Sequence, residues 1–376
     1  MNQSSQQSTD LSPAFDLQDK QFSRAFSIIT EAIEQRAFPA ATLAVTHRGS
    51  LIALRGFGRF TYESDAPMVE AGTIFDLASV TKVVATTAVA MLLYEREKLP
   101  LDIPVGHFLP DFVARSPRHQ QATREAVTLR MLLAHSSGLP AYEKLFEFAG
   151  SREELVRSAL TTRLVAAPGT RAEYSDVGFI LLGEVLARQA DLALDLFARQ
   201  EVFTPLGMTH TRFNPPAEWK PQIPPTEDDR TFRKRIIQGE VNDENSSVMG
   251  GVAGQAGVFA PAIDVARFAE CMLRRGAPIF KAETVQLFTR RAESPAGSSR
   301  ALGWDTPSPE SSSGTQFSVS SFGHLGFTGT SLWIDPTRQL SVTLLTNRTW
   351  PNRASQGIRR VRPALHDAIV EAFEER

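Results

Sequence analysis

Strand-like segments lie near both ends of this 376-residue chain, and mostly helical patterns fill the stretch between them. Near the start, residues 41–46 and 51–58 are β-rich runs joined by a short turn in which Gly49 can adopt a positive φ, which indicates a hairpin. Near the end, strand-like runs cover residues 316–322, 330–334 and 340–346. Segments this far apart predict an α/β (α+β) fold, in which an antiparallel sheet built from both ends is flanked by helices and carries a large, mostly helical insertion.

Amphipathic patterns place helices beside and between these strands. Apolar residues recur at three- and four-residue steps in residues 22–38, and a final helix is expected at 360–373. Between the strands, helices are expected at 83–95, 128–134, 152–161 and 177–190. We expect residues 1–18 to be a disordered arm and residues 19–376 to form one domain, with an α/β lobe at about 19–78 and 293–376 and a helical lobe at about 79–292. A functional cleft is expected between the lobes.

The charge balance and the apolar runs exclude several classes of partner. Lys and Arg total 40 and Asp and Glu total 42, so the chain lacks the basic excess that phosphate binding requires, and we expect no nucleic-acid partner. No run approaches the ~18 uninterrupted apolar residues of a transmembrane helix. The first residues lack the basic and apolar regions of a Sec signal, so we expect a cytoplasmic location, and a periplasmic one only if the start codon is misassigned. The oligomeric state is left open.

The residues that usually hold metals or cofactors are missing or isolated. Cys271 is the single cysteine, which leaves no disulfide and no thiolate cluster, and it is expected to be a small core residue. His135 and His210 have no partner at metal-ligand spacing, so no metal is expected. The glycine-rich run 250–257 lacks the ending of a phosphate-binding loop and is expected to line the cleft, with Gln255 facing it. No cofactor is expected.

Ser79 and Lys82 form a Ser-x-x-Lys motif at the start of an apolar helix. Residues three positions apart on a helix share a face, so the hydroxyl and the amine can form a hydrogen bond. A serine hydroxyl needs a neighbouring base to become a nucleophile, and a lysine can serve when desolvation and nearby positive charge lower its pKa. The helix N-terminus also favours the negative charge that develops during attack. Because a chain of this length contains about one such motif by chance, the motif alone does not establish catalysis.

Two further segments carry groups that such chemistry uses. Tyr174 precedes another apolar helix, with Asp176 two positions later, and a tyrosine beside a lysine ammonium loses its proton more easily. The alternative is a helix start capped by Ser175 or Asp176. The run 323–329 (GHLGFTG) lies between two expected strands, and its glycines let the backbone approach a ligand and donate an N–H to an oxyanion. The alternative is a glycine-rich hairpin with an incidental histidine.

Taken together, the three segments resemble the Ser-x-x-Lys, Tyr-x-Asn and Lys-Thr-Gly motifs of serine β-lactamases and penicillin-binding proteins, in the branch with class C β-lactamases, D-alanyl-D-alanine peptidases and esterases. Residues 132–140, 205–208 and 327–336 also resemble that branch, and the likeness covers about residues 22–373. It implies that Ser79 is the acylated nucleophile, Lys82 the base, Tyr174 the proton shuttle and His324 the counterpart of the third-motif lysine. The oxyanion hole would be the N–H groups of Ser79 and Phe327, beside Gly326.

Two departures from the family motifs affect the expected substrate. Asp176 replaces the usual Asn and can pair with Lys82, and His324 replaces a lysine that binds a substrate carboxylate. Arg348, at the end of the last strand, could replace some of the lost charge. We expect an esterase first and a D-alanyl-D-alanine carboxypeptidase or penicillin-binding protein second. A class C-like β-lactamase is a further alternative, with efficient β-lactam hydrolysis disfavoured by these two departures. A penicillin- or peptide-binding sensor without turnover is the alternative outside enzymes. The expected partner is a small ester, peptide or β-lactam.

Overall fold

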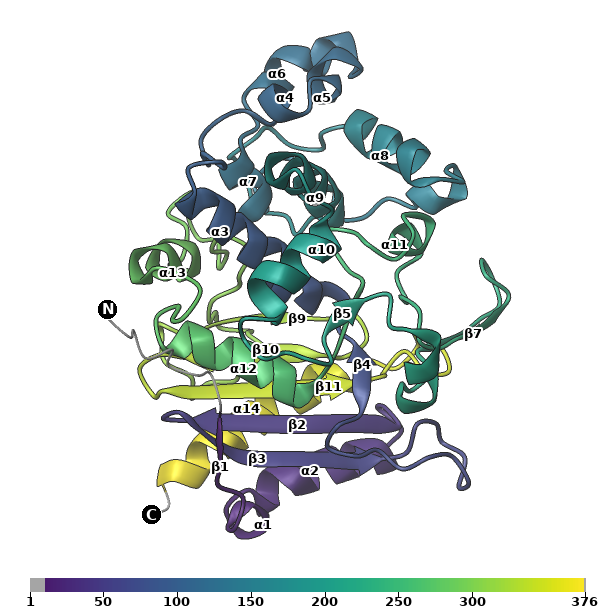
Figure 1. The fold of residues 1–376 in the computed structure, drawn as a ribbon, viewed down its shortest axis with the longest axis vertical. Coiled ribbons are helices and arrows are strands. Elements are labelled where there is room, and N and C mark those ends of the chain that lie inside the picture. The colour runs from purple at the N-terminus through teal and green to yellow at the C-terminus, as the bar shows by residue number, and fades with distance from the viewer. Residues whose placement is uncertain (1–10, 375–376) are drawn as a thin grey trace, which may run out of the picture.

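The computed structural model describes residues 11–374, and both ends of that stretch build one six-stranded sheet with the order β1-β3-β2-β11-β10-β9 (Figure 1). The N-terminal strands are β1 (Ser12–Pro13), β2 (Ala40–His47) and β3 (Ser50–Gly58), and the C-terminal strands are β9 (Phe322–Leu325), β10 (Ser331–Asp335) and β11 (Leu340–Thr346). Antiparallel pairing of β11 with β2, from Leu340 opposite His47 to Thr346 opposite Ala41, joins the two ends. The predicted fold class is confirmed.

Side chains alternate between the two faces of the sheet along each strand, and helices cover the apolar side chains on both faces. On β10, Trp333 points into a core shared with α2 (Ser23–Glu34) and α14 (Ile358–Glu374). Its neighbours Leu332 and Ile334 point into the larger core that contains α12 (Ala262–Leu273). We expected residues 262–273 in the helical lobe, but α12 packs on the sheet and contacts β2, β10 and β11.

Two local expectations need correction. Residues 11–18 of the expected disordered arm are ordered, since β1 pairs in parallel with β3, Leu11 is buried, and α1 (Gln18–Gln21) begins at the end of this stretch. Residues 1–10 lie outside the described part of the chain. The strand expected at 316–322 begins only at Phe322, because Ser318 is held in a turn by hydrogen bonds to the Asp335 carboxylate (2.7 and 2.9 Å).

The helical lobe is organised around α3 (Ala88–Glu95) and α9 (Asp176–Ala190), which contact each other. The other helices are α4 (Val105–Phe108), α5 (Asp111–Ala114), α6 (Gln121–Glu125), α7 (Leu129–Leu133), α8 (Arg152–Thr161), α10 (Leu194–Ala198), α11 (Glu244–Val248) and α13 (Ala282–Thr289). Short strands β4 (Ile74–Asp76), β5 (Arg212–Phe213) and β8 (Val258–Pro261) form a second sheet, and β6 (Glu227–Asp229) pairs with β7 (Arg235–Ile237).

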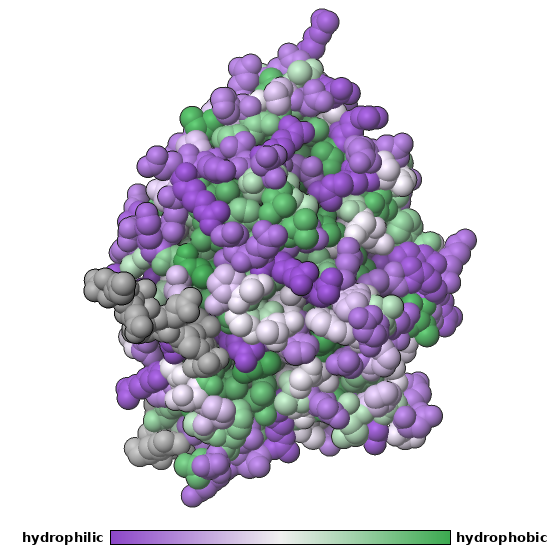
Figure 2. All heavy atoms as spheres, in the orientation of Figure 1, coloured by the Kyte–Doolittle hydropathy of each residue, from purple (hydrophilic) through white to green (hydrophobic). Residues whose placement is uncertain are grey.

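One helical stretch, Ala78–Glu95, is long and apolar enough to cross a membrane by length and composition, with a mean hydropathy of 1.2. It is 83% buried inside the protein, so its apolar character is accounted for by its central position in the helical core. Hydrophilic residues are spread over the molecular face in Figure 2, with smaller apolar areas between them.

Candidate active site

Ser79 lies at the junction between β4 and the central helix, where the backbone is held in an unusual conformation. Ala78 has a φ of 46°, which is rare for a residue with a side chain. Its N–H donates to Asp76 Oδ1 (2.8 Å), and the N–H of Asn242 donates to Asp76 Oδ2 (2.7 Å). Burial raises the pKa of Asp76 to about 6, although these two bonds oppose the shift. Asp76 therefore fixes the turn that presents Ser79.

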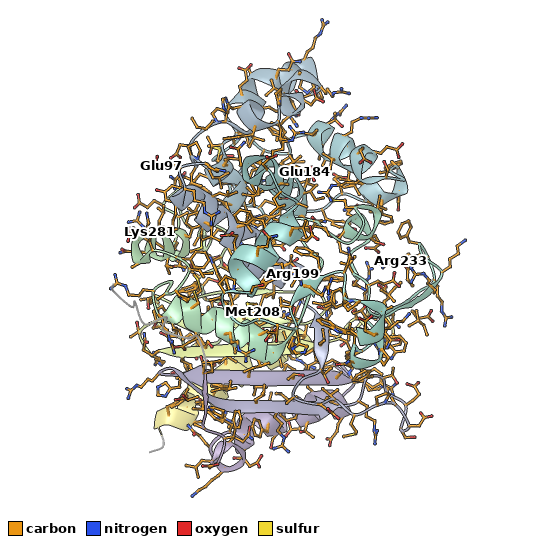
Figure 3. The ribbon with its side chains drawn as sticks, viewed as in Figure 1. Glu97, Glu184, Arg199, Met208, Arg233 and Lys281 are labelled. Atoms are coloured by element: carbon orange, nitrogen blue, oxygen red, sulfur yellow. The ribbon has the colours of Figure 1, made fainter. Side chains whose placement is uncertain are left out.

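The loop that carries Asn242 is itself anchored. Arg233, labelled in Figure 3, donates to the carbonyls of Val241 and Asn242 (2.7 Å each) and pairs with the Asp229 carboxylate (2.9 Å). The hairpin of β6 and β7 thus supports the Asp76 turn from the outside of the pocket.

Lys82 is completely buried and brings three groups together. After a 3₁₀ turn at Ala78–Val80, the chain forms a π-helical turn at Lys82–Thr87, a conformation that often marks functional sites. The Lys82 Nζ donates to Ser79 Oγ (2.9 Å) and to the Gln255 carbonyl (3.0 Å), and it lies 2.6 Å from Asp176 Oδ1. The expected Ser79–Lys82 bond and the Lys82–Asp176 pair are both present.

The charge state of Lys82 differs from our expectation. Burial lowers the pKa of Lys82, but the Asp176 carboxylate and Tyr174 outweigh burial and hold that pKa above its ordinary value. Burial also raises the pKa of Asp176, against the effect of Lys82. At rest the site therefore contains an ammonium, and the nearest group able to take a proton is the Asp176 carboxylate.

Tyr174 is positioned by the start of α9 and by a histidine. Ser175 caps the helix by accepting from the N–H of Gly178 (3.1 Å), so the capping interpretation is correct for Ser175 and compatible with a catalytic Tyr174. Lys82 Nζ lies 4.9 Å from the centroid of the Tyr174 ring. Burial raises the pKa of Tyr174 even though Lys82 and Ser79 favour its ionised form, so Tyr174 is a phenol at neutral pH rather than the readily ionised group we expected.

His135 is a site residue whose role the sequence analysis missed. Its Nδ1 accepts from the N–H of Ser175 (3.0 Å), and its ring packs against Tyr174 (centroids 4.7 Å apart) and Phe179 (5.0 Å). Burial and nearby cations hold the pKa of His135 well below its ordinary value, so it is a neutral support for Tyr174. The only sequence indication was its place in the family-like segment 132–140.

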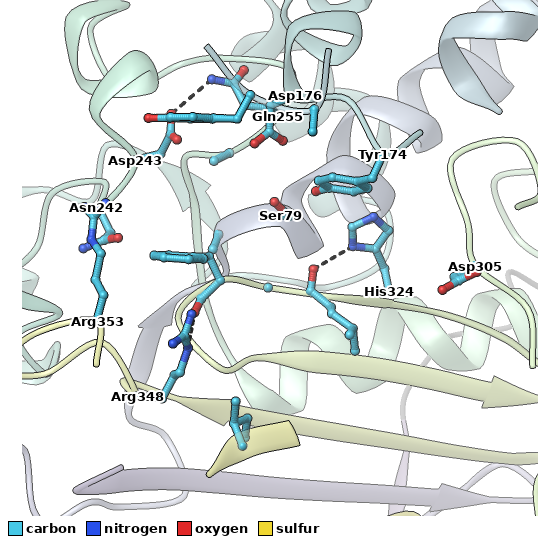
Figure 4. Close-up of a pocket in the computed structure, with 18 of the residues that line it drawn as sticks. Ser79, Tyr174, Asp176, Asn242, Asp243, Gln255, Asp305, His324, Arg348 and Arg353 are labelled. Carbon is cyan, nitrogen blue, oxygen red and sulfur yellow. Dashed lines mark hydrogen bonds between the residues drawn. The ribbon is translucent and has the colours of Figure 1, made fainter. Parts of the chain in front are cut away.

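His324 lies on β9 beside Tyr174, with ring centroids 5.9 Å apart, but it cannot supply the charge of a lysine. Its Nδ1 is 2.8 Å from the Leu325 carbonyl, drawn as a dashed line in Figure 4. That carbonyl can only accept, so Nδ1 carries the proton. Burial and the charges of Lys82 and Arg300 hold the pKa of His324 well below its ordinary value. His324 is therefore a neutral imidazole beside Tyr174.

The backbone groups expected to form the oxyanion hole line the same cavity. Ser79 and Phe327 both border a pocket of about 680 Å³, and neither backbone N–H bonds to another residue of the described chain. A Cβ on Gly326 would lie 2.5 Å from the Leu77 carbonyl, so only glycine allows the strand end to approach the Ser79 turn this closely. Hydrogen bonds from Thr328 to Asp76 O and from Thr330 to Leu77 O (2.9 Å each) hold that approach.

Arg348 also borders the pocket, on the opposite side of Ser79 from Tyr174 and His324 in Figure 4. Its Nε donates to the Phe327 carbonyl (2.7 Å) and its Nη1 to the Ser355 carbonyl (3.0 Å). Burial, Arg359 and Arg353 lower the pKa of Arg348. Within residues 11–374 Arg348 has no carboxylate partner, whereas Arg353 pairs with Glu227 and Glu244 (2.8 and 2.7 Å).

The structure thus brings every residue of the predicted site to one pocket: Ser79, Tyr174, Asp176, His324, Gly326, Phe327 and Arg348 border it, and Lys82 lies behind Ser79. Sequence reasoning did not identify Asn242, Asp243, Arg300, Arg353 or Arg362, which also line it.

Comparison with known proteins agrees with this geometry. A sequence model of the Beta-lactamase family matches residues 26–365. A putative D-alanyl-D-alanine carboxypeptidase of Escherichia coli (strain K12) is 30% identical, with 83% of this chain and 79% of the relative covered. An N-acetylmuramyl-L-alanine amidase of Bacillus subtilis (strain 168) is 33% identical, with 83% and 77% covered. The solved structure of EstCE1, a hydrolase with promiscuous acyltransferase activity, shares the fold with a TM-score of 0.77 and 23% identity, covering 94% of this chain and all of EstCE1.

Proposed function

The chain belongs to the Beta-lactamase family of serine hydrolases, and from this premise we propose that it hydrolyses carboxylic esters through an acyl-enzyme on Ser79. The observation that carries the proposal is the 2.9 Å bond between Lys82 Nζ and Ser79 Oγ at the base of a 680 Å³ pocket. That pocket also contains a phenol and two backbone N–H groups that have no acceptor within the described part of the chain, and these are the groups that acyl transfer uses.

The proton route runs through the ion pair. As Ser79 Oγ attacks the ester carbon, Lys82 takes the hydroxyl proton and passes one of its own protons to Asp176. Lys82 thus stays an ammonium, and Asp176 becomes neutral as the negative charge forms on the substrate oxygen. The tetrahedral oxyanion is held by the N–H groups of Ser79 and Phe327. On collapse, the bond to the leaving group breaks, Tyr174 gives its proton to the departing alkoxide, and Lys82 and Asp176 restore the proton of Tyr174. Water then repeats the sequence in the alcohol's place and frees Ser79.

A neutral ester is the favoured substrate because His324 itself is uncharged, and Arg300, a cation that borders the pocket near His324, pairs with Asp305 (3.6 Å). His324 is buried and neutral, so a substrate carboxylate gains no charge partner from β9. The name of EstCE1, a hydrolase with acyltransferase activity on the same fold, is compatible with this choice.

A D-alanyl-D-alanine carboxypeptidase is the second candidate, and Arg348 is the observation in its favour. Arg348 Nη2 makes no bond to other described residues, and it could bind a terminal carboxylate. The names of the E. coli and B. subtilis relatives point to cell-wall peptides. If Arg348→Ala slows anionic and neutral esters to the same extent, Arg348 has no role in substrate choice.

Intact-mass measurement separates the candidates. Wild type and Ser79→Ala are mixed in turn with a fluorophosphonate, a p-nitrophenyl ester and a penicillin. Rapid ester turnover without a penicillin adduct selects the esterase, and a lasting penicillin adduct selects the peptidase or a binding protein without turnover. A fluorophosphonate adduct that persists in Ser79→Ala would show that Ser79 is not the nucleophile.

A further inference from the structure

The peptide group between Gly326 and Phe327 has an arginine bound to its carbonyl. In a trans peptide the C=O of Gly326 and the N–H of Phe327 lie in one plane and point in opposite directions. Arg362, on α14, donates through Nη2 to the Gly326 carbonyl (2.9 Å) and to the Thr330 carbonyl (2.7 Å). The Gly329 N–H also donates to the Gly326 carbonyl (3.0 Å), so Arg362 and this turn together fix where the N–H on the far side points.

Arg362 brings a positive charge to this peptide without a counterion. It is 6% exposed, and among residues 11–374 it has no carboxylate within ion-pair distance. Its Nε is buried and has no hydrogen-bond partner in the part of the chain that the structure describes. Burial and Arg348 lower the pKa of Arg362 to about 9, which leaves it charged at neutral pH.

Arg348 secures the next peptide in the same way. Its Nε holds the Phe327 carbonyl at 2.7 Å, so the carbonyl groups on both sides of Phe327 are bound by guanidinium groups. Among the described residues the Phe327 N–H has no acceptor, and Phe327 borders the pocket together with Ser79.

We propose that Arg362 is a positioning residue of the oxyanion hole, which aims the Phe327 N–H at the reacting carbonyl oxygen and polarises it through the shared peptide group. The inference rests on the proposed acyl-enzyme at Ser79. A charged donor on the carbonyl withdraws electron density from the peptide and strengthens its N–H as a donor, because linked hydrogen bonds polarise one another. The stronger hydrogen bond from the Phe327 N–H stabilises the substrate oxygen most when that oxygen carries negative charge. Arg362 therefore favours the tetrahedral state over the bound ester.

A purely structural role is the competing explanation, and Arg124 is a matched control for it. Arg124 is likewise buried and bonds only to backbone carbonyls, those of Phe112, Thr162 and Leu160, but it lies in the helical lobe and does not border the pocket. Losing either guanidinium should lower the thermal midpoint, and only loss of Arg362 should weaken oxyanion binding.

The test compares wild type, Arg362→Gln, Arg362→Lys and Arg124→Gln. Each is assayed for kcat and KM on a p-nitrophenyl ester and for affinity to a boronic acid that forms an anionic tetrahedral adduct on Ser79. The carbonyl stretch of a ¹³C-labelled acyl-enzyme is recorded by infrared difference spectroscopy. We expect Arg362→Gln to lose about tenfold in kcat and in boronate affinity, with little change in KM and a carbonyl stretch at higher wavenumber. Arg362→Lys should fall between it and wild type, and Arg124→Gln should match wild type in everything except the thermal midpoint.

The inference is overturned if Arg362→Gln is less stable but binds boronate like wild type and leaves the carbonyl stretch in place. If Arg362→Gln does not fold, a further variant, Arg362→Met, decides the question, because methionine keeps a long unbranched side chain without a charge or a donor, and wild-type values for both readouts would again reject the role. A wild-type protein that takes neither acyl group nor boronate on Ser79 would refute the proposed function itself.

Discussion

Replacing Asp176 by Asn tests the proton route most directly. The change keeps the shape of the side chain but removes the carboxylate that lies 2.6 Å from Lys82 Nζ. The two side chains are 0% and 18% exposed, so the variant leaves a buried ammonium without its partner. Breaking a buried pair costs about 3–5 kcal/mol, and the partial exposure of Asp176 places the expected loss in unfolding free energy near the lower figure, about 3 kcal/mol at neutral pH.

The pH dependence has a definite sign. In the wild type Asp176 and Tyr174 outweigh burial and raise the pKa of Lys82, so the ionisation of Lys82 stabilises the folded state below the unfolded lysine pKa, and this contribution is lost as the pH rises through the folded pKa. In Asp176→Asn burial dominates and lowers the pKa of Lys82. The folded variant then binds the Lys82 proton less tightly than the unfolded chain does. Its loss of unfolding free energy relative to wild type is therefore largest at neutral pH and becomes smaller as the pH rises.

Activity should follow the same change in protonation. At neutral pH the variant has no acceptor for the proton of Lys82, and kcat/KM on a p-nitrophenyl ester should fall about 100-fold or more. At alkaline pH Lys82 becomes a neutral amine and can itself take the Ser79 proton, so activity should partly recover. Asp305→Asn is the control, since Asp305 also borders the pocket but pairs with Arg300 (3.6 Å) rather than Lys82. An Asp176→Asn enzyme with wild-type kcat/KM and pH profile would refute the relay.

Three further outcomes follow from the site. Gly326→Ala should reduce ester turnover and cost about 1–3 kcal/mol of stability, because its Cβ would meet the Leu77 carbonyl at 2.5 Å. The control is Gly72→Ala, whose Cβ would meet nothing within 4 Å and which should match wild type in denaturant melts and ester assays. Equal behaviour of the two variants would contradict the close approach at Gly326. Because the pKa of folded Asp76 is about 6, above the ordinary carboxyl value, the folded state binds this proton first, so the stability contributed by this group should rise as pH falls from 7 to 5. Urea unfolding should show that Asp76→Asn lacks this increment, and an identical pH dependence in both proteins would argue against the shift. His324→Gln should leave the shape of the kcat/KM profile near neutral pH unchanged, since the pKa of His324 lies well below its ordinary value; an ionisation near pH 6.5 that disappears in the variant would show that His324 titrates there.

Local patterns in the sequence were sufficient for the central strands of the sheet and for the chemical identity of the site. The hairpin of β2 and β3 was predictable because Gly49 supplies a positive φ between two β-rich runs, and the structure has φ values of 50° and 82° at Arg48 and Gly49. The Ser79–Lys82 bond was predictable because three-residue spacing places both groups on one face of a helix. The expected strand at 316–322 was wrong because the Asp335 carboxylate, from another strand, captures Ser318 in a turn.

The sequence by itself determined which groups are available: a serine, a lysine, a tyrosine, an aspartate in place of an asparagine and a histidine in place of a lysine. Only the tertiary structure decided their charge states, because a pKa depends on burial and on charges that approach through space. Asp176 keeps Lys82 protonated, burial keeps His324 neutral, and α14 carries Arg362 to a carbonyl 36 residues away in the chain. No periodicity or spacing encodes these contacts, since they arise where distant segments pack against one another.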